Sequence, residues 1–84
     1  MTYGVYSVRD HYGTFGTIFC HANENTAKRY VARLIGNTDS DIAFSPADYD
    51  LYHVGDFDCE SGMVDVVTPI EFICNGLDLV GGNK

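Results

Sequence analysis

The first third of the chain shows the pattern of a β-hairpin. Residues 3–9 are rich in Tyr and Val, which favour strands. Asp10-His11-Tyr12-Gly13 has the composition of a turn, and residues 14–21 return as a second strand-forming stretch. The pattern predicts that these two strands pair antiparallel.

The next segment has the period of a helix. Its apolar residues recur three and four positions apart: Ala27, Tyr30, Val31, Leu34 and Ile35. This spacing predicts a helix over about residues 24–35 with one apolar face. Asn23 is a suitable N-cap, Glu24 places negative charge in the first turn, and Gly36-Asn37 is expected to end the helix in a left-handed conformation.

A loop and a turn are expected after the helix. Residues 38–43 are polar, and Phe44 is expected to fold back onto the core. Residues 46–50 form a proline-led turn in which Asp48 can accept hydrogen bonds from nearby backbone amides.

The remaining pattern predicts three further strands over residues 51–57, 63–68 and 70–74, with Pro69 as the break between the last two. Gly55 lies inside a strand and indicates a bulge or a close approach; an aromatic ring packed over it is the favoured interpretation.

The chain is expected to end with a turn at Asn75-Gly76, a last edge piece over residues 77–80 and a frayed end at 81–84. The element order is ββαβββ. It predicts one α+β domain over residues 1–84, with one helix packed on one face of a small antiparallel sheet.

Charge limits the classes of partner. The chain has 12 acidic and 5 basic residues and a net charge of −7. Binding to nucleic-acid phosphates requires clustered Lys and Arg, so any such contact must be local or pass through a basic partner. The chain shows neither a signal-peptide pattern nor an apolar run of membrane-spanning length, which predicts a soluble intracellular protein.

No catalytic or metal-binding motif stands out. A zinc site can be drawn only from Cys20, His21, His53 and Cys59, but neighbouring Cys20 and His21 would point to opposite faces of a strand. The acidic run Asp56, Asp58 and Glu60 lacks the glycine and glutamate of a calcium loop, since Ser61 and Val67 hold those positions. There is no nucleophile elbow and no phosphate loop, so we expect a protein that is not an enzyme and needs no cofactor.

The basic residues of the predicted helix are the best functional candidates. Lys28, Arg29 and Arg33 lie opposite its apolar stripe, and the last two are one turn apart. They could follow phosphates, helped by Arg9 and by Tyr12 or Phe15 as stacking groups. The alternative is a solvated face that balances nearby carboxylates.

The order of residues between 45 and 62 carries a family resemblance. The run contains Pro46, Asp48, Tyr49, Leu51, Tyr52, Gly55, Phe57, Asp58 and Gly62. This order resembles the small nonstructural protein of gokushovirus-type microviruses, which are single-stranded DNA phages. The likeness extends to residues 3–10, Ala22-Asn23, Ala27, Arg29 and Tyr30, and departs at Gly16-Thr17-Ile18, where family members often carry prolines.

The resemblance implies a nonstructural protein in the cytoplasm of an infected bacterium. It would act without catalysis in viral DNA replication or in single-strand production and packaging. Its partner would be single-stranded DNA or an acidic patch of the viral replication protein. The alternative is an interaction module that binds a host protein or itself and makes no contact with DNA.

Both faces of the expected sheet carry large apolar groups. Strict alternation places Tyr3 and Val5 on one side of the first strand and Tyr6 and Val8 on the other, and separates Leu51 and Phe57 from Tyr52 and Val54. One helix covers only one face. We therefore expect a homo-oligomer.

Overall fold

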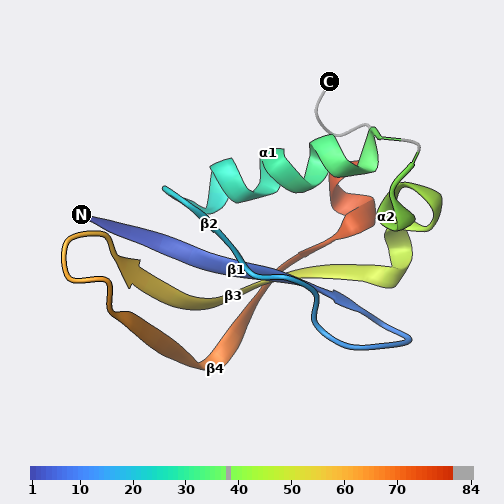
Figure 1. The fold of residues 1–84 in the computed structure, drawn as a ribbon. Helices are drawn as coiled ribbons and strands as arrows, with labels where there is room; N and C mark the ends of the chain where they lie inside the picture. Colours follow the sequence, from blue (N-terminus) through green and yellow to red (C-terminus); the bar gives the residue numbers. More distant parts are fainter. Residues whose placement is uncertain (38, 81–84) are drawn as a thin grey trace.

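The computed structural model describes residues 1–37 and 39–80. Its elements are β1 (Thr2–Asp10), β2 (Phe19–His21), α1 (Glu24–Ile35), α2 (Asp41–Phe44), the 3₁₀ turn η1 (Pro46–Asp48), β3 (Tyr49–Asp58), β4 (Val64–Asn75) and the 3₁₀ turn η2 (Gly76–Leu79) (Figure 1). The expected frayed end at 81–84 lies outside the described residues. No helix in the described part of the chain is both long and apolar enough to cross a membrane.

The four strands form one antiparallel sheet in the order β2-β1-β3-β4, and α1 lies across one side of it (Figure 1). The predicted α+β class is confirmed, as are the first hairpin and the helix bounds. Asn23 caps α1, because its side-chain oxygen accepts a hydrogen bond from the backbone N–H of Thr26 at 2.9 Å. The buried core between α1 and the sheet consists of Tyr6, Ala27, Val31, Ile42, Leu51 and Cys74.

The contacts of α1 distinguish the two faces of the sheet. Tyr6 and Leu51 belong to the core beneath α1, with Val8 packed against them. We call this side the helix face. Strand neighbours point to opposite sides, so Ser7 and Tyr52 lie on the other side, which we call the open face.

A β-bulge at Val54 interrupts the alternation in β3. Tyr6 pairs with His53, and the preceding Val5 pairs with Gly55. Val54 is therefore an extra residue with no partner in β1. The ladder between β3 and β4 shifts at the same place.

The bulge changes which face the end of β3 presents. Phe57 pairs with Tyr3 and so lies on the open face together with Tyr52. The expectation that Phe57 shares a side with Leu51 is wrong, because strict alternation does not hold across an inserted residue.

Glycine is required at position 55 because the backbone of β4 lies close to it, and not because an aromatic ring packs over it. A Cβ at this position would lie 2.7 Å from the carbonyl oxygen of Asp65 on β4. The expectation of an aromatic ring over Gly55 is wrong. The bulge brings the two strands so close that only glycine fits.

The strands predicted on either side of Pro69 are one strand, β4. Its pairing with β3 passes from Val66 directly to Glu71, so Pro69 lies in a stretch that has no partner in β3. β4 is also the edge strand of the sheet. A proline without an N–H is tolerated there, because no ladder hydrogen bond is lost.

The second strand is shorter than predicted. Only Phe19–His21 pairs continuously with β1, and a single bridge joins Arg9 to Phe15. The intervening loop is held differently: the hydroxyl of buried Ser7 donates to the carbonyl of Gly16 at 3.0 Å. This contact takes the place of strand pairing.

Two local expectations around the helices are wrong. Gly36 has φ −73° and its N–H bonds to the Ala32 carbonyl, so α1 ends right-handed. Phe44 is 92% exposed, because the single turn of α2 directs Ile42 into the core instead.

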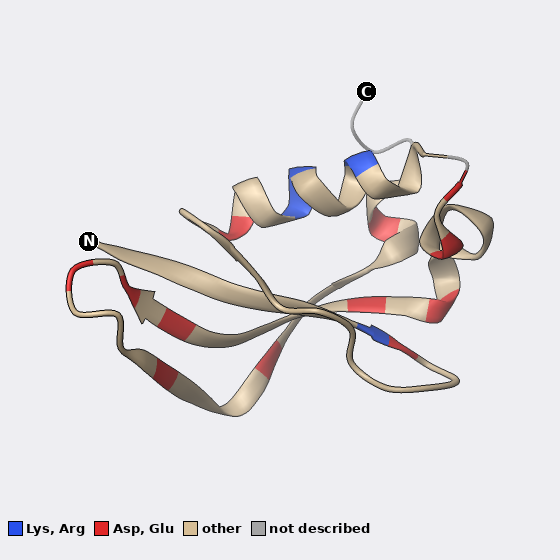
Figure 2. Cartoon of the chain, viewed as in Figure 1, with Lys and Arg blue, Asp and Glu red and all other residues tan. Residues whose placement is uncertain are grey.

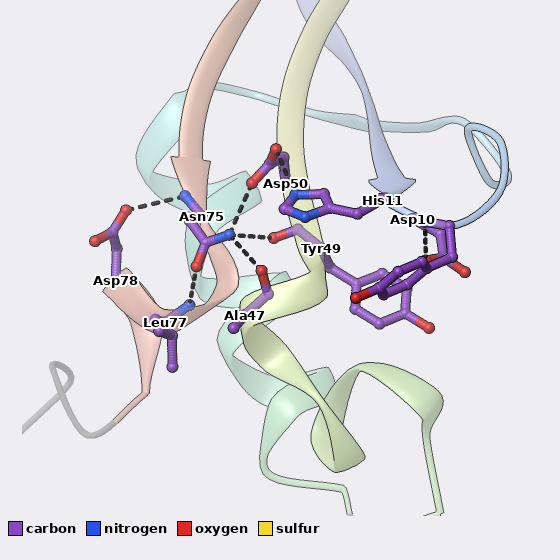
Figure 3. A network of polar contacts seen from close by, with 9 residues as sticks. Asp10, His11, Ala47, Tyr49, Asp50, Asn75, Leu77 and Asp78 are labelled. Atoms are coloured by element: carbon purple, nitrogen blue, oxygen red, sulfur yellow. Dashed lines mark hydrogen bonds and ion pairs between the residues drawn. The ribbon is translucent and has the colours of Figure 1, made fainter.

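The expected edge piece over residues 77–80 is also wrong, since η2 occupies most of this segment. The side chain of Asn75 accepts from the N–H of Leu77 and donates to the carbonyls of Ala47 and Tyr49 and to the Asp50 carboxylate (Figure 3). These contacts turn the chain back toward η1. A Cβ on Gly76 would collide with the carbonyl of Pro46, so glycine is needed at this junction as well.

The approach of Gly55 to Asp65 predicts a stability effect. Gly55→Ala should lower the free energy of unfolding by about 1–3 kcal/mol, because the added methyl forces two strands apart. Urea unfolding measures the effect. Gly13→Ala is the matched control: its Cβ would meet nothing closer than 3.6 Å. Equal stabilities for the Gly55 and Gly13 variants would contradict the close approach.

Candidate nucleic-acid interface

The outer side of α1 carries exposed positive charge. The helix buries Ala27 and Val31 against the sheet, which leaves Arg29 and Arg33 exposed on the side turned away from the core. Figure 2 shows blue segments along α1 and one near the end of β1, whereas red segments are spread over the strands, their turns, the start of α1 and the segment after α1. The basic charge is therefore local, as the composition requires.

Ion pairing distinguishes the three basic residues of the helix. Lys28 lies 3.3 Å from the carboxylate of Glu24, one turn earlier. No ion pair found within residues 1–37 and 39–80 involves Arg29 or Arg33. The interpretation of a solvated, balanced face thus applies to Lys28, whereas the two guanidinium groups keep their binding capacity.

The two arginines border a small hollow between α1 and β2. It has a volume of about 170 Å³ and is lined by His21, Thr26, Arg29, Tyr30 and Arg33. We call it the helix–β2 hollow. The rings of His21 and Tyr30 lie 5.2 Å apart, and Phe19 packs 4.9 Å from Tyr30 on the inner side.

This arrangement has the chemistry of a nucleotide contact. Guanidinium groups bind phosphate oxygens in a bidentate manner, and His and Tyr rings offer surfaces on which a base can stack. Thr26 adds a hydroxyl that already donates to Asn23 at 3.0 Å. The hollow therefore combines groups that can bind a phosphate with rings that can stack on a base.

Sequence patterns do not indicate that His21 and Tyr30 bind a ligand. Tyr30 falls in the apolar stripe of the helix, and His21 enters only the zinc site that can be drawn from scattered residues. One signal was available: the predicted hairpin ends directly before the helix, which places His21 beside the first turns of α1.

The remaining predicted site residues lie elsewhere. Arg9 follows Val8 of the helix face and so belongs to the open face, where its guanidinium lies 5.8 Å from the ring centroid of Phe15. Phe15 in turn packs against Tyr52 at 5.3 Å. Tyr12 is 85% exposed in the turn between β1 and β2. The structure does not bring this group together with the arginines of α1.

The residues of the 45–62 run have structural roles in the fold. Pro46 begins η1, Tyr49 packs against the core, and Leu51 is buried within it. Asp48 accepts from the Ser45 hydroxyl at 2.7 Å, where a backbone amide was expected.

The acidic turn after β3 is closed by its own hydrogen bonds. The N–H of Glu60 and the hydroxyl of Ser61 donate to Asp58, which holds the pKa of that carboxyl below its usual value. Gly62 completes the turn with φ 78°, a left-handed conformation that favours glycine. Within the described part of the chain, no group of His, Cys, Asp and Glu has the arrangement of a metal site.

A family model described as "Phage ORF5 protein" matches residues 3–79. The chain belongs to this phage protein family. Neither a curated protein nor a solved structure matches it. The resemblance to a small phage protein is confirmed, and the narrower assignment to microviruses stays a prediction.

Next to the bulge, the partly buried His53 lies between two carboxylates, and we call these three residues the His53 cluster. Nδ1 of His53 lies 2.8 Å from Glu71 and Nε2 lies 3.0 Å from Asp56. Partial burial lowers the pKa of His53, but the hydrogen bonds and negative charges of Glu71 and Asp56 outweigh it, so the net pKa is raised. Both ring nitrogens face a carboxylate, which leaves neither available as a catalytic base.

The raised pKa of His53 predicts a pH-dependent stability. The contribution is fully present below about pH 6.5, where the unfolded chain is also protonated, and is lost as pH rises through the folded-state pKa. Urea unfolding between about pH 6 and pH 9 should show falling stability. His53→Gln should flatten this profile, whereas His21→Gln should preserve it. An unchanged decline in the His53 variant would contradict the role of the cluster.

Proposed function

We propose that this phage protein is a non-enzymatic accessory of viral DNA replication or single-strand production. It would act in the cytoplasm of the infected bacterium and contact single-stranded DNA through the helix–β2 hollow. One observation carries the proposal: Arg29 and Arg33 take part in no ion pair of the described residues and lie beside two aromatic rings, in a chain of net charge −7.

The aromatic lining of the hollow and the small number of basic residues favour single-stranded over double-stranded DNA. The aromatic lining is useful only to a base that is not stacked in a double helix. A duplex binder would instead need an extended positive surface, and the chain has only 5 basic residues.

The same geometry sets the strength of binding. Two guanidinium groups neutralise at most two phosphates, so log K should fall with log salt with a slope of about −1.4. Since the remaining surface is acidic, contact should be weak and favoured by low salt. These are the properties of an accessory protein that binds exposed strands transiently.

A second candidate is an interaction module with no DNA contact. The same two arginines can pair with carboxylates of the viral replication protein or of a host protein, because guanidinium groups recognise carboxylate and phosphate alike. The exposed apolar part of the open face also favours protein contacts.

Binding of a short oligothymidylate across a salt series tests the first candidate. Wild type should bind at low salt, and Arg29→Ala and Arg33→Ala should each reduce the slope by about 0.7. His21→Ala should weaken binding with little change in slope, because a ring contributes stacking and not phosphate contact.

Arg9→Ala is the matched control, because it removes the same charge from the opposite side of the sheet. No binding at low salt would refute direct DNA contact. Equal losses for the Arg9 and Arg29 variants would refute the assigned location. Pull-down of the replication protein by wild type, but not by the Arg29 and Arg33 variants, would then support the second candidate.

A further inference from the structure

The open face of the sheet is largely apolar, and no helix of the described chain covers it. α1, α2 and η2 all lie on the other side, as Figure 1 shows. The loop before β2 packs on one part of the open face, through Gly16 at Ser7 and Phe15 at Tyr52, and Val5 and Ser7 are buried. Val64, which pairs with Phe57, is 58% exposed, and Val66, which pairs with Gly55, is 79% exposed. A contiguous apolar patch of this kind often marks an interaction site.

Aromatic rings cross this face from one element to the next. Phe15, Tyr52 and Phe72 form a row, with ring centroids 5.3 Å and 5.8 Å apart. Phe72 is 57% exposed although it lies in a strand. The row joins the loop before β2 to the edge strand, so the surface is continuous.

The charges of the strands are segregated between the two faces. Pairing and alternation place five strand carboxylates on the helix face: Asp10, Asp56, Asp58, Asp65 and Glu71. The charged strand residues on the open face are Arg9 and Asp50, which are partners in the ladder and have opposite charges. The Asp50 carboxylate itself pairs with His11 at 2.8 Å. In a chain of net charge −7, the open face is thus neutral.

The absence of net charge on the strands of the open face indicates which kind of partner it binds. A nucleic acid would require a positive surface, and a basic or acidic protein would require an opposite charge. A second copy of the same neutral apolar surface requires neither, and a two-fold axis makes such a surface complementary to itself.

We infer that the open face binds a second copy of this chain, sheet against sheet. The apolar side chains of the two open faces would interdigitate at the spacing of about 10 Å typical of stacked sheets. Both α1 helices would then lie on the outside, with the two helix–β2 hollows still accessible. The inference does not depend on the proposed function.

The size of the face sets the expected affinity. Three long strands of about 30 Å, spaced by about 5 Å, span on the order of 500 Å². The part at Val5 and Ser7 is already buried within one chain, so the free area is below the lower limit of stable interfaces, which is about 600 Å² per partner. The dimer should therefore dissociate on dilution.

Sedimentation velocity over a range of micromolar concentrations tests the inference. The mass should rise with concentration from the 9.3 kDa of one chain toward twice that value. Val66→Asp and Phe72→Asp should each raise the dissociation constant about tenfold or more, because a buried unpaired carboxylate is strongly unfavourable. Both side chains are exposed in one copy, so the variants should fold, which circular dichroism checks.

Phe44→Asp is the matched control, since it places the same charge on a 92% exposed ring outside the open face and should associate like wild type. A wild-type mass of one chain at every concentration would refute the inference, as would open-face variants that dimerise like wild type. Loss of oligothymidylate binding in Phe72→Asp, with a monomeric wild type, would instead identify the face as a stacking platform for DNA. Arg29→Ala should leave the mass unchanged, so failure of one proposal is distinguishable from failure of the other.

Discussion

The bulge at Val54 is the constraint on which the rest of this structure depends. A strand of β3's length would otherwise alternate strictly, and the residues after position 54 would exchange faces. With the bulge, Phe57 lies on the open face and Asp56 lies on the helix face beside His53. The close approach of Gly55 to Asp65 and the His53 cluster both stabilise this irregular point. One inserted residue thus separates a charged face from a neutral one.

The two faces of the sheet therefore offer different surfaces for binding. On the helix face, α1 completes the core and carries its arginines outward, where β2 adds aromatic rings to form the hollow. On the open face, Asp50 is the one strand carboxylate of the described chain, and an aromatic row runs across the sheet. The contacts of Asn75 turn the end of the chain onto the α1 side, so η2 does not cover the open face (Figures 1 and 3). The two proposed contacts, with a DNA strand and with a second copy, would therefore use opposite sides of the molecule.

Local patterns predicted much of this fold. The helix bounds, its N-cap and the succession of the main strands along the chain follow from residue period and capping chemistry, which act over a few neighbours. The errors arise where distant segments meet. The pattern around Pro69 does not reveal that β4 is an edge strand, and the composition around Gly55 does not reveal that Asp65 lies against it. The candidate site was predicted in part: Arg29 and Arg33 follow from helical spacing, whereas their separation from Arg9 depends on which way β1 faces.

A single titration tests the central claim, that the outer side of α1 and not the open face contacts single-stranded DNA. Backbone amide and arginine Nε–H signals would be followed by NMR as oligothymidylate is added at low salt. We expect shifts at His21, Arg29, Tyr30 and Arg33 that are reversed by salt, with Arg9 and Phe72 unchanged. Shifts confined to Arg9, Tyr52 and Phe72, or no shifts at low salt, would contradict this claim.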